Sequence, residues 1–276
     1  MSDIILAMLR TIIGSDFAQG ADGLKHSAAT YNSGAFAFVN QINAVAVKPV
    51  AAVIAGGILV LQFARISAKY EGDHKAGTQQ VAAATITAAM IVVTIQNTDL
   101  IIGAINEIGD KIIRGVAKLN PGSRGNGLPD GMVEAVENMD TIDKAGLMLI
   151  LFLPWIIGIL AGLILKIVIF MRFAEMYLLI AGSTLPISFL GHPETKSIAI
   201  GFLKKYAKVV LKGVAILIVI ALYTRFQIGS IDVNAIANAD GLKSMASNLG
   251  SLIAGPIFFI FLIVSTDRIA SALVGD

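Results

Sequence analysis

Long apolar runs alternate with short polar stretches along this chain, and the runs have the length of membrane-spanning helices. A helix rises about 1.5 Å per residue, so roughly 20 apolar residues cross the roughly 30 Å of hydrocarbon in a bilayer. Five runs meet or approach that length, at about 44–64, 80–104, 145–165, 207–226 and 249–265. The pattern therefore predicts five transmembrane helices.

The third apolar block continues to about residue 190, which is too long for one crossing. After 145–165 it carries Lys166, Arg172 and Glu175, and then an apolar piece interrupted by small and polar residues and a proline (Gly182, Ser183, Thr184, Pro186). Proline removes a backbone donor and bends a helix. We expect a broken or re-entrant element at the cytoplasmic side, acting as a gate or docking surface or as a membrane-exit anchor. A sixth crossing over about 174–190 is the alternative.

The fold class expected from these runs is an all-α polytopic membrane protein. A β-barrel would show segments of about ten residues with alternating polarity, whereas these runs are continuous and rich in Ala, Leu and Ile. Residues 1–14 place apolar side chains at helical spacing around Arg10. They predict a short amphipathic helix on the membrane surface, with a cleaved leader as the alternative.

Composition strengthens the membrane assignment and narrows the chemistry. Hydrophobic residues make up 56% and charged residues 14% of the 276 residues, with a net charge of +2; soluble domains carry about 25% charged residues. This excludes a soluble enzyme and a free nucleic-acid-binding domain. The chain has no cysteine, and its three histidines lie far apart, at 26, 74 and 192. We expect no metal site and no cofactor.

Basic residues predict the orientation of the chain. The segments 65–79 and 191–212 are rich in Lys and Arg, and two crossings between them return the chain to the same, cytoplasmic side. The chain is expected to begin with an amphipathic, extracytoplasmic segment at 1–43, followed by the first two transmembrane helices at 44–104. An extracytoplasmic loop at 105–144 then leads to a C-terminal bundle at 145–276, which contains the Lys-rich segment. The C-terminus then lies inside.

Several polar residues near the apolar runs have two interpretations each. Lys48 either lines a pathway or extends its amine to the membrane interface. The polar notch 96–99 either faces a water-filled path or marks the end of the second span. A set of lysines on one predicted helix, three of them spaced by four residues, either docks an acidic partner or nucleic acid or contacts anionic lipid heads: Lys204, Lys205, Lys208 and Lys212.

Glycine-containing patterns point to packing rather than to catalysis. Gly158 and Gly162 form a small-xxx-small pair that lets helices approach closely. The glycine-rich segment 122–127 follows Asn120-Pro121 and opens no predicted helix, so it matches neither a P-loop nor a dinucleotide fingerprint. No Ser–His, paired-acid or His-x-x-x-His arrangement lies inside a span. We expect no enzymatic activity.

A resemblance to a known family rests on the second half of the chain. A long apolar helix runs into Arg-Phe-Ala-Glu-Met-Tyr at 172–177, and Ser-Thr-Leu-Pro-Ile follows at 183–187. A polar stretch then leads to Ile-Gly-Phe-Leu-Lys-Lys-Tyr at 200–206 and to another apolar helix. This arrangement resembles the TrbL-like family, the polytopic inner-membrane subunits of type IV secretion and conjugation machines.

The resemblance implies a non-enzymatic channel or scaffold subunit in the bacterial cytoplasmic membrane, which helps to pass DNA or protein beside a separate ATPase. It also implies a homo-oligomer in contact with lipid and with other secretion-system membrane subunits. The family offers no catalytic residues. Arg172, Glu175 and Pro186 lie in the resembling segments and are the candidates for gating or assembly. A small solute carrier, with its binding site at a discontinuous helix such as the Pro186 region, is the alternative.

Overall fold

The computed structural model describes residues 1–14, 17, 20–70, 74–119, 128, 131–228 and 249–275. Among these residues, five helices are long and apolar enough to cross a membrane. They cover Ser33–Lys69, Lys75–Gln96, Thr141–Gly182, Lys196–Phe226 and Leu249–Val274. The all-α polytopic fold is confirmed, and the number of candidate spans among the described residues equals the five predicted crossings.

The first candidate span begins earlier than the apolar pattern predicts. Helix α4 (Ser33–Ile42) continues through the π-helical turn η2 (Asn43–Val47) into α5 (Lys48–Lys69). Pro49 lacks an N–H for the carbonyl of Val45, which accounts for a local change of hydrogen-bond spacing. The predicted boundary between 43 and 44 therefore falls inside a helix.

The second apolar run divides at Asn97 into two helices, α6 (His74–Gln96) and α7 (Thr98–Lys118). The polar notch therefore ends the second span, which was one of its two interpretations. The region 105–144, expected as a loop, contains the rest of α7 and the short helix α8 (Met132–Glu137). Its predicted turn residues at 120–127 lie outside the described residues, as does the connection 229–248.

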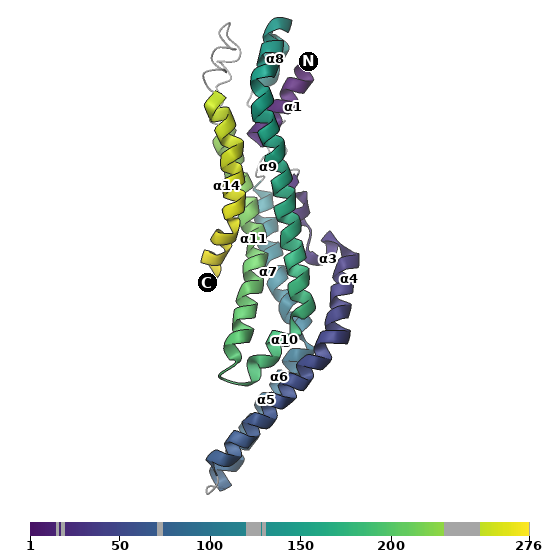
Figure 1. Ribbon diagram of the computed structural model, residues 1–276, viewed down its shortest axis with the longest axis vertical. Coiled ribbons are helices and arrows are strands. Elements are labelled where there is room, and N and C mark those ends of the chain that lie inside the picture. The colour runs from purple at the N-terminus through teal and green to yellow at the C-terminus, as the bar shows by residue number, and fades with distance from the viewer. Residues whose placement is uncertain are drawn as a thin grey trace. The chain divides into compact units, whose positions relative to one another are not determined.

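Helix α9 (Thr141–Gly182) runs without interruption past Lys166 and Arg172 (Figure 1). The break predicted from Gly182, Ser183, Thr184 and Pro186 is present at residues 183–191, as the short helix α10 (Thr184–Ile187) and the 3₁₀ turn η3 (Ser188–Gly191). The last two long helices are α11 (Lys196–Ile228) and α14 (Leu249–Val274). The lysines at 204, 205, 208 and 212 thus belong to a helix, as predicted.

The chain forms two compact units, which we describe separately. Unit 1 contains Met1–His26, Gly109–Arg172 and Leu211–Ala272. Unit 2 contains Ser27–Ile108, Phe173–Val210 and Leu273–Asp276. The long helices α7, α9 and α11 each contribute one part to each unit.

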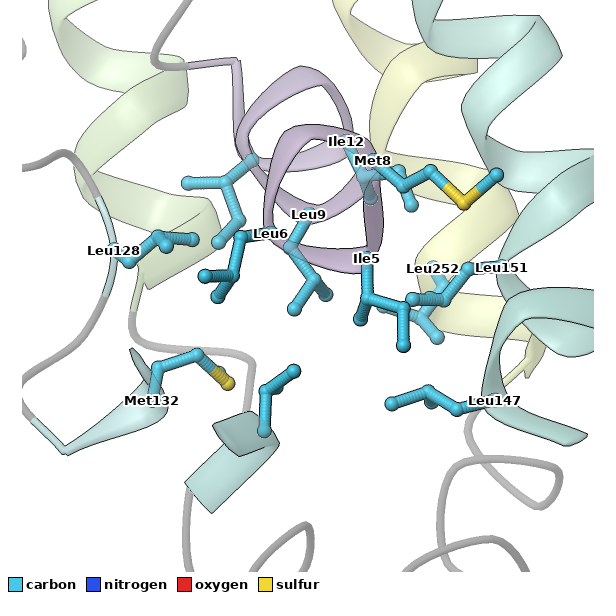
Figure 2. Close-up of a cluster of buried hydrophobic side chains, with 12 residues drawn as sticks. Ile5, Leu6, Met8, Leu9, Ile12, Leu128, Met132, Leu147, Leu151 and Leu252 are labelled. Carbon is cyan, nitrogen blue, oxygen red and sulfur yellow. The ribbon is translucent and has the colours of Figure 1, made fainter. Parts of the chain in front are cut away.

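The core of unit 1 is built around the predicted N-terminal helix, which is α1 (Ser2–Ile13). Its apolar face is buried, and Figure 2 shows side chains of this face extending toward Leu128, Met132 and Leu147. The same cluster includes Leu151 of α9 and Leu252 of α14. The sequence pattern predicts this face against lipid, but in the structure it is covered by protein. Periodicity identifies an apolar face without identifying what covers it.

Close approach of α1 to α9 depends on small residues. A Cβ on Gly158 would lie 3.1 Å from Cγ2 and 3.2 Å from the carbonyl oxygen of Thr11, and one on Gly162 would lie 3.4 Å from the ring of Phe17. Phe17 in turn stacks on Phe259 with ring centroids 4.3 Å apart. The Gly158–Gly162 pair thus faces the N-terminal segment of its own chain.

In unit 2, aromatic contacts and a helical hairpin form the core. Tyr31 of the short helix α3 (Ala28–Tyr31) stacks on Phe173 of α9 at 3.8 Å, and the hydroxyl of Tyr177 donates to the carbonyl of Ala28 at 2.8 Å. Helices α5 and α6 pack along each other and against η3 and α10. A small apolar cluster joins the hairpin to the break: Ala55, Ile91, Ile95 and Ile187.

Candidate functional site

The most costly group inside a candidate span is Arg172 of α9, in unit 1. Arg172 is only 1% exposed, and its side chain is among the largest that are fully buried. The guanidinium lies against the backbone of Gly213 on α11, where a Cβ would come within 2.6 Å of Nε. Only glycine leaves room for the guanidinium at position 213, so Arg172 packs directly against the backbone of Gly213.

A carboxyl on α7 belongs to the same surroundings as Arg172. Burial raises the pKa of Asp110 above its ordinary value, while the positive charges of Arg172 and Arg114 lower it by less. The net direction shows that desolvation outweighs both guanidinium groups at this carboxyl. The charge of Arg172 thus acts on Asp110 of α7.

The lysines of α11 do not share one environment. Lys204 and Lys205 are exposed. Lys212 in unit 1 is different, since its side chain is 15% exposed and its Nζ lies 3.2 Å from Asp267 Oδ1 on α14. Lys212 is thus occupied by an internal ion pair, and neither interpretation of the lysine face, docking or lipid contact, describes it.

In unit 2, the break between α9 and α10 is held by one buried side chain, Asn43 of η2. The amide nitrogen of Asn43 donates to the carbonyls of Ile180 and Ala181 at 3.1 and 3.0 Å and to Ser183 Oγ at 3.1 Å. Its oxygen accepts from the hydroxyl of Thr184 at 2.7 Å. Because α9 ends here, its last carbonyls lack the usual helical donors. The Ile180 carbonyl also accepts from the N–H and the hydroxyl of Ser183 at 3.2 and 2.9 Å, and Asn43 adds a donor from another segment to Ile180 and Ala181.

A second polar feature of unit 2 lies at the start of α5 and the start of α7. Lys48 Nζ lies 3.1 Å from Asp99 Oδ2, with side-chain exposures of 27% and 59%. Asp99 also lines a cavity of about 250 Å³. The cavity wall carries three further polar side chains and four apolar or small residues: Asn40, Asn106, Ser183, Phe36, Ile102, Gly103 and Ile180.

The connection after η3 is tied to α5 by Arg65. Its Nη1 lies 2.7 Å from His192 Nε2 and 3.0 Å from Glu194 Oε1. The hydrogen bond and the charge of Arg65 lower the pKa of the exposed Glu194 carboxyl below its ordinary value. Arg65, His192 and Glu194 thus fix the connection between η3 and α11.

We predict a pH-dependent contribution from this pair. A carboxyl with a lowered folded-state pKa stabilises the fold above its ordinary value of 4.5 and loses that contribution as the pH falls through the folded-state value. Wild type should therefore melt slightly above Glu194→Gln at pH 7, and the difference should shrink as the pH falls below 4.5. Melting curves in detergent across this range, with Arg65→Gln as the matched variant, measure it. A difference that grows toward low pH would contradict the assignment.

None of these groups forms a metal site. The described residues contain no group of three or more His, Asp or Glu that could hold a metal ion. The arrangement provides a buried arginine, two partly buried ion pairs, a helix break held by a buried amide, and a polar cavity. In a membrane protein such groups are expensive to bury and mark positions that function or assembly depends on.

Comparison with known families decides what kind of membrane protein this is. A family described as TrbL/VirB6 plasmid conjugal transfer like protein matches residues 13–184, which is more than half of the chain. The chain belongs to the TrbL/VirB6 family. No curated protein and no solved structure matches it.

The TrbL/VirB6 match covers some of the predicted site residues and leaves others outside. It includes Arg172 and Glu175 as well as both packing glycines of α9, and it ends just before Pro186. Pro186 is half-buried in α10, and Glu175 is half-buried on α9. Gly213, against which Arg172 packs, and the lysines of α11 lie beyond the matched region.

Sequence reasoning identified Arg172 in this TrbL/VirB6 chain but missed its partners. Gly213 is one of 27 glycines, and only the fold distinguishes it. Asn43 carried no distinguishing signal, because Asn40 and Gln41 lie beside it in the sequence. Asp110 and His192 carried none, since each lies in a stretch with several other polar residues.

Proposed function

We propose that this chain is a non-enzymatic channel or scaffold subunit of a type IV secretion machine that transfers DNA or protein across the bacterial cytoplasmic membrane. The observation that carries the proposal is the TrbL/VirB6 match over residues 13–184 in a chain with five candidate spans. Family membership makes the chain a membrane component of conjugal transfer; the channel or scaffold role is the finer proposal.

The polar sites support a role in assembly or gating rather than in chemistry. Buried charges such as Arg172 specify one arrangement of helices, because any other arrangement leaves them unpaired in an apolar medium. We assign Arg172, Glu175 and the Pro186 break to gating or assembly. The sequence has no P-loop, so the energy for transfer comes from a separate ATPase.

Self-association and orientation are parts of the same proposal. Many large apolar side chains of the candidate spans are exposed in the single chain, among them Leu149, Phe170 and Phe261, and lipid or further copies of the chain cover them. Following the Lys and Arg bias, we place the N-terminus and Gly115 outside, and the start of α11 and the C-terminus inside.

Deletion and complementation in the native host test the function. We expect an in-frame deletion to reduce conjugation or secretion at least about a thousandfold, and a plasmid copy to restore it, because a missing membrane subunit leaves no continuous path. Growth on single solutes serves as the parallel readout. Normal transfer combined with loss of uptake of one solute would overturn the proposal in favour of a solute carrier.

A further inference from the structure

We propose that the cavity beside Asp99 in unit 2 binds the headgroup of phosphatidylethanolamine. The ammonium group enters the cavity toward Asp99, and the phosphate stays at its mouth beside Lys48. The lipid's acyl chains lie against the outer surface of the hairpin formed by α5 and α6. This inference needs a membrane around the protein but does not depend on its role in secretion.

The first argument is the depth of the charge pair. Helices α5 and α6 have 22 and 23 residues, pack along each other, and are separated in sequence only by residues 70–73. They therefore run antiparallel, and each is about 33 Å long, close to the thickness of the hydrocarbon. Lys48 begins α5, and Asp99 follows the end of α6. Both charges thus lie at one end of the hairpin. We take α5, paired with α6 in the hairpin, as the part of the longer apolar helix Ser33–Lys69 that crosses the hydrocarbon, which places this end at the depth of lipid headgroups.

The second argument is the order of the two charges. Asp99 lines the cavity, whereas Lys48 pairs with it from outside the lining. In phosphatidylethanolamine the ammonium is the outermost group, and the phosphate lies between it and the acyl chains. A headgroup that inserts its end into the cavity brings its cation to the carboxylate and its anion to the lysine. The order of the two charges therefore fits a zwitterionic headgroup in one orientation only, with its ammonium at Asp99 and its phosphate at Lys48.

The third argument is the hydrogen-bonding capacity of the cavity wall. A primary ammonium donates three hydrogen bonds. The Asp99 carboxylate and the Asn40 amide oxygen line the cavity and can accept. The Ser183 hydroxyl also lines it, but already accepts from Asn43 and donates to Ile180. Asn106 is held in place by the hydroxyl of Tyr206, which donates to its Oδ1 at 2.8 Å. A volume of about 250 Å³ is ample for an ethanolammonium group.

These features predict discrimination between lipids. Phosphatidylcholine carries a trimethylammonium without N–H donors, so it would leave the acceptors unpaired. Phosphatidylglycerol has no cation for Asp99. We expect phosphatidylethanolamine to be enriched about fivefold over either lipid, the effect of one charge-assisted hydrogen bond at a partly exposed site.

The experiment is lipid retention by the full-length protein. Wild type is reconstituted in nanodiscs with equal amounts of palmitoyl-oleoyl phosphatidylethanolamine, phosphatidylcholine and phosphatidylglycerol, and the retained lipid is measured by native mass spectrometry. Lys48→Met and Asp99→Asn should each lose the enrichment. Asp22→Asn, which breaks the exposed Lys25–Asp22 pair elsewhere in the chain, is the matched control and should keep it.

A charge-swapped variant separates binding from folding. Lys48→Asp combined with Asp99→Lys keeps an ion pair but reverses its polarity, so it should fold with an unchanged melting temperature and still lose the enrichment. Equal retention of the three lipids by wild type, or enrichment that survives the swap, would overturn the proposal. Release of the lipid by millimolar O-phosphoethanolamine would overturn the lipid assignment in favour of a soluble ligand.

Discussion

Gly213→Ala should lower the melting temperature of the detergent-solubilised protein by more than about 5 °C. The new methyl group would lie within 2.6 Å of Nε and Nη1 of Arg172, a residue that is 1% exposed. The guanidinium then has to move away from Gly213 while it stays buried. Displacing a buried charge from its surroundings costs on the order of 3 kcal/mol of folding free energy. Fluorescence-detected size-exclusion chromatography after heating measures the shift.

The matched control is Gly201→Ala on the same helix. A Cβ at Gly201 meets nothing within 4 Å, so this change should leave the melting temperature unaltered or slightly raised. A double-mutant cycle with Arg172→Met then isolates the contact, because Gly213→Ala should cost little once the guanidinium is absent. Equal losses in the presence and absence of Arg172 would show that Gly213 does not act through it.

The second large effect is expected from Asn43→Leu. Leucine resembles asparagine in size but cannot donate to the carbonyls of Ile180 and Ala181 or accept from Thr184. Each buried polar group left without a partner costs about 1–3 kcal/mol. We expect a loss of about 3 kcal/mol or more, and faster proteolysis within 183–195, where the chain turns between α9 and α11.

Asn97→Leu provides the comparison for Asn43. Asn97 is exposed, and its amide donates only to the carbonyl of Val93 one helical turn earlier. Its loss should be below about 0.5 kcal/mol. Equal stability of the two variants would contradict the proposal that the hydrogen bonds of Asn43 stabilise the break between α9 and α10.

The number of spans followed from the sequence because it depends on a local quantity, the apolar content of about 20 consecutive residues. The exact ends did not follow. Gly182, Ser183 and Pro186 predicted the break after α9, and the structure has it at residues 183–191. Arg172 lies within the continuous helix because tertiary contacts accommodate its charge, as Gly213 does. Predicting the contact between Arg172 and Gly213 requires knowing that α11 packs against α9 at this point.

For the candidate sites too, local features could be predicted from the sequence and tertiary contacts could not. Arg172 stood out because a charge in an apolar run is costly wherever the chain folds. Its surroundings, and those of Asn43, involve residues up to 141 positions away, and no local pattern encodes such pairings. The amphipathic face of α1 was evident from its period. Its burial by α8, α9 and α14 was not, because lipid and protein provide equally apolar partners.

The most direct test of the account is the sidedness of two single cysteines. The chain has no cysteine of its own, Gly115 has open space around its Cα, and Ile200 is 41% exposed. In whole cells, a membrane-impermeant maleimide should label Gly115→Cys. It should label Ile200→Cys only after the cells are opened. Labelling of position 200 from outside would contradict the five-crossing arrangement on which the proposed membrane subunit rests.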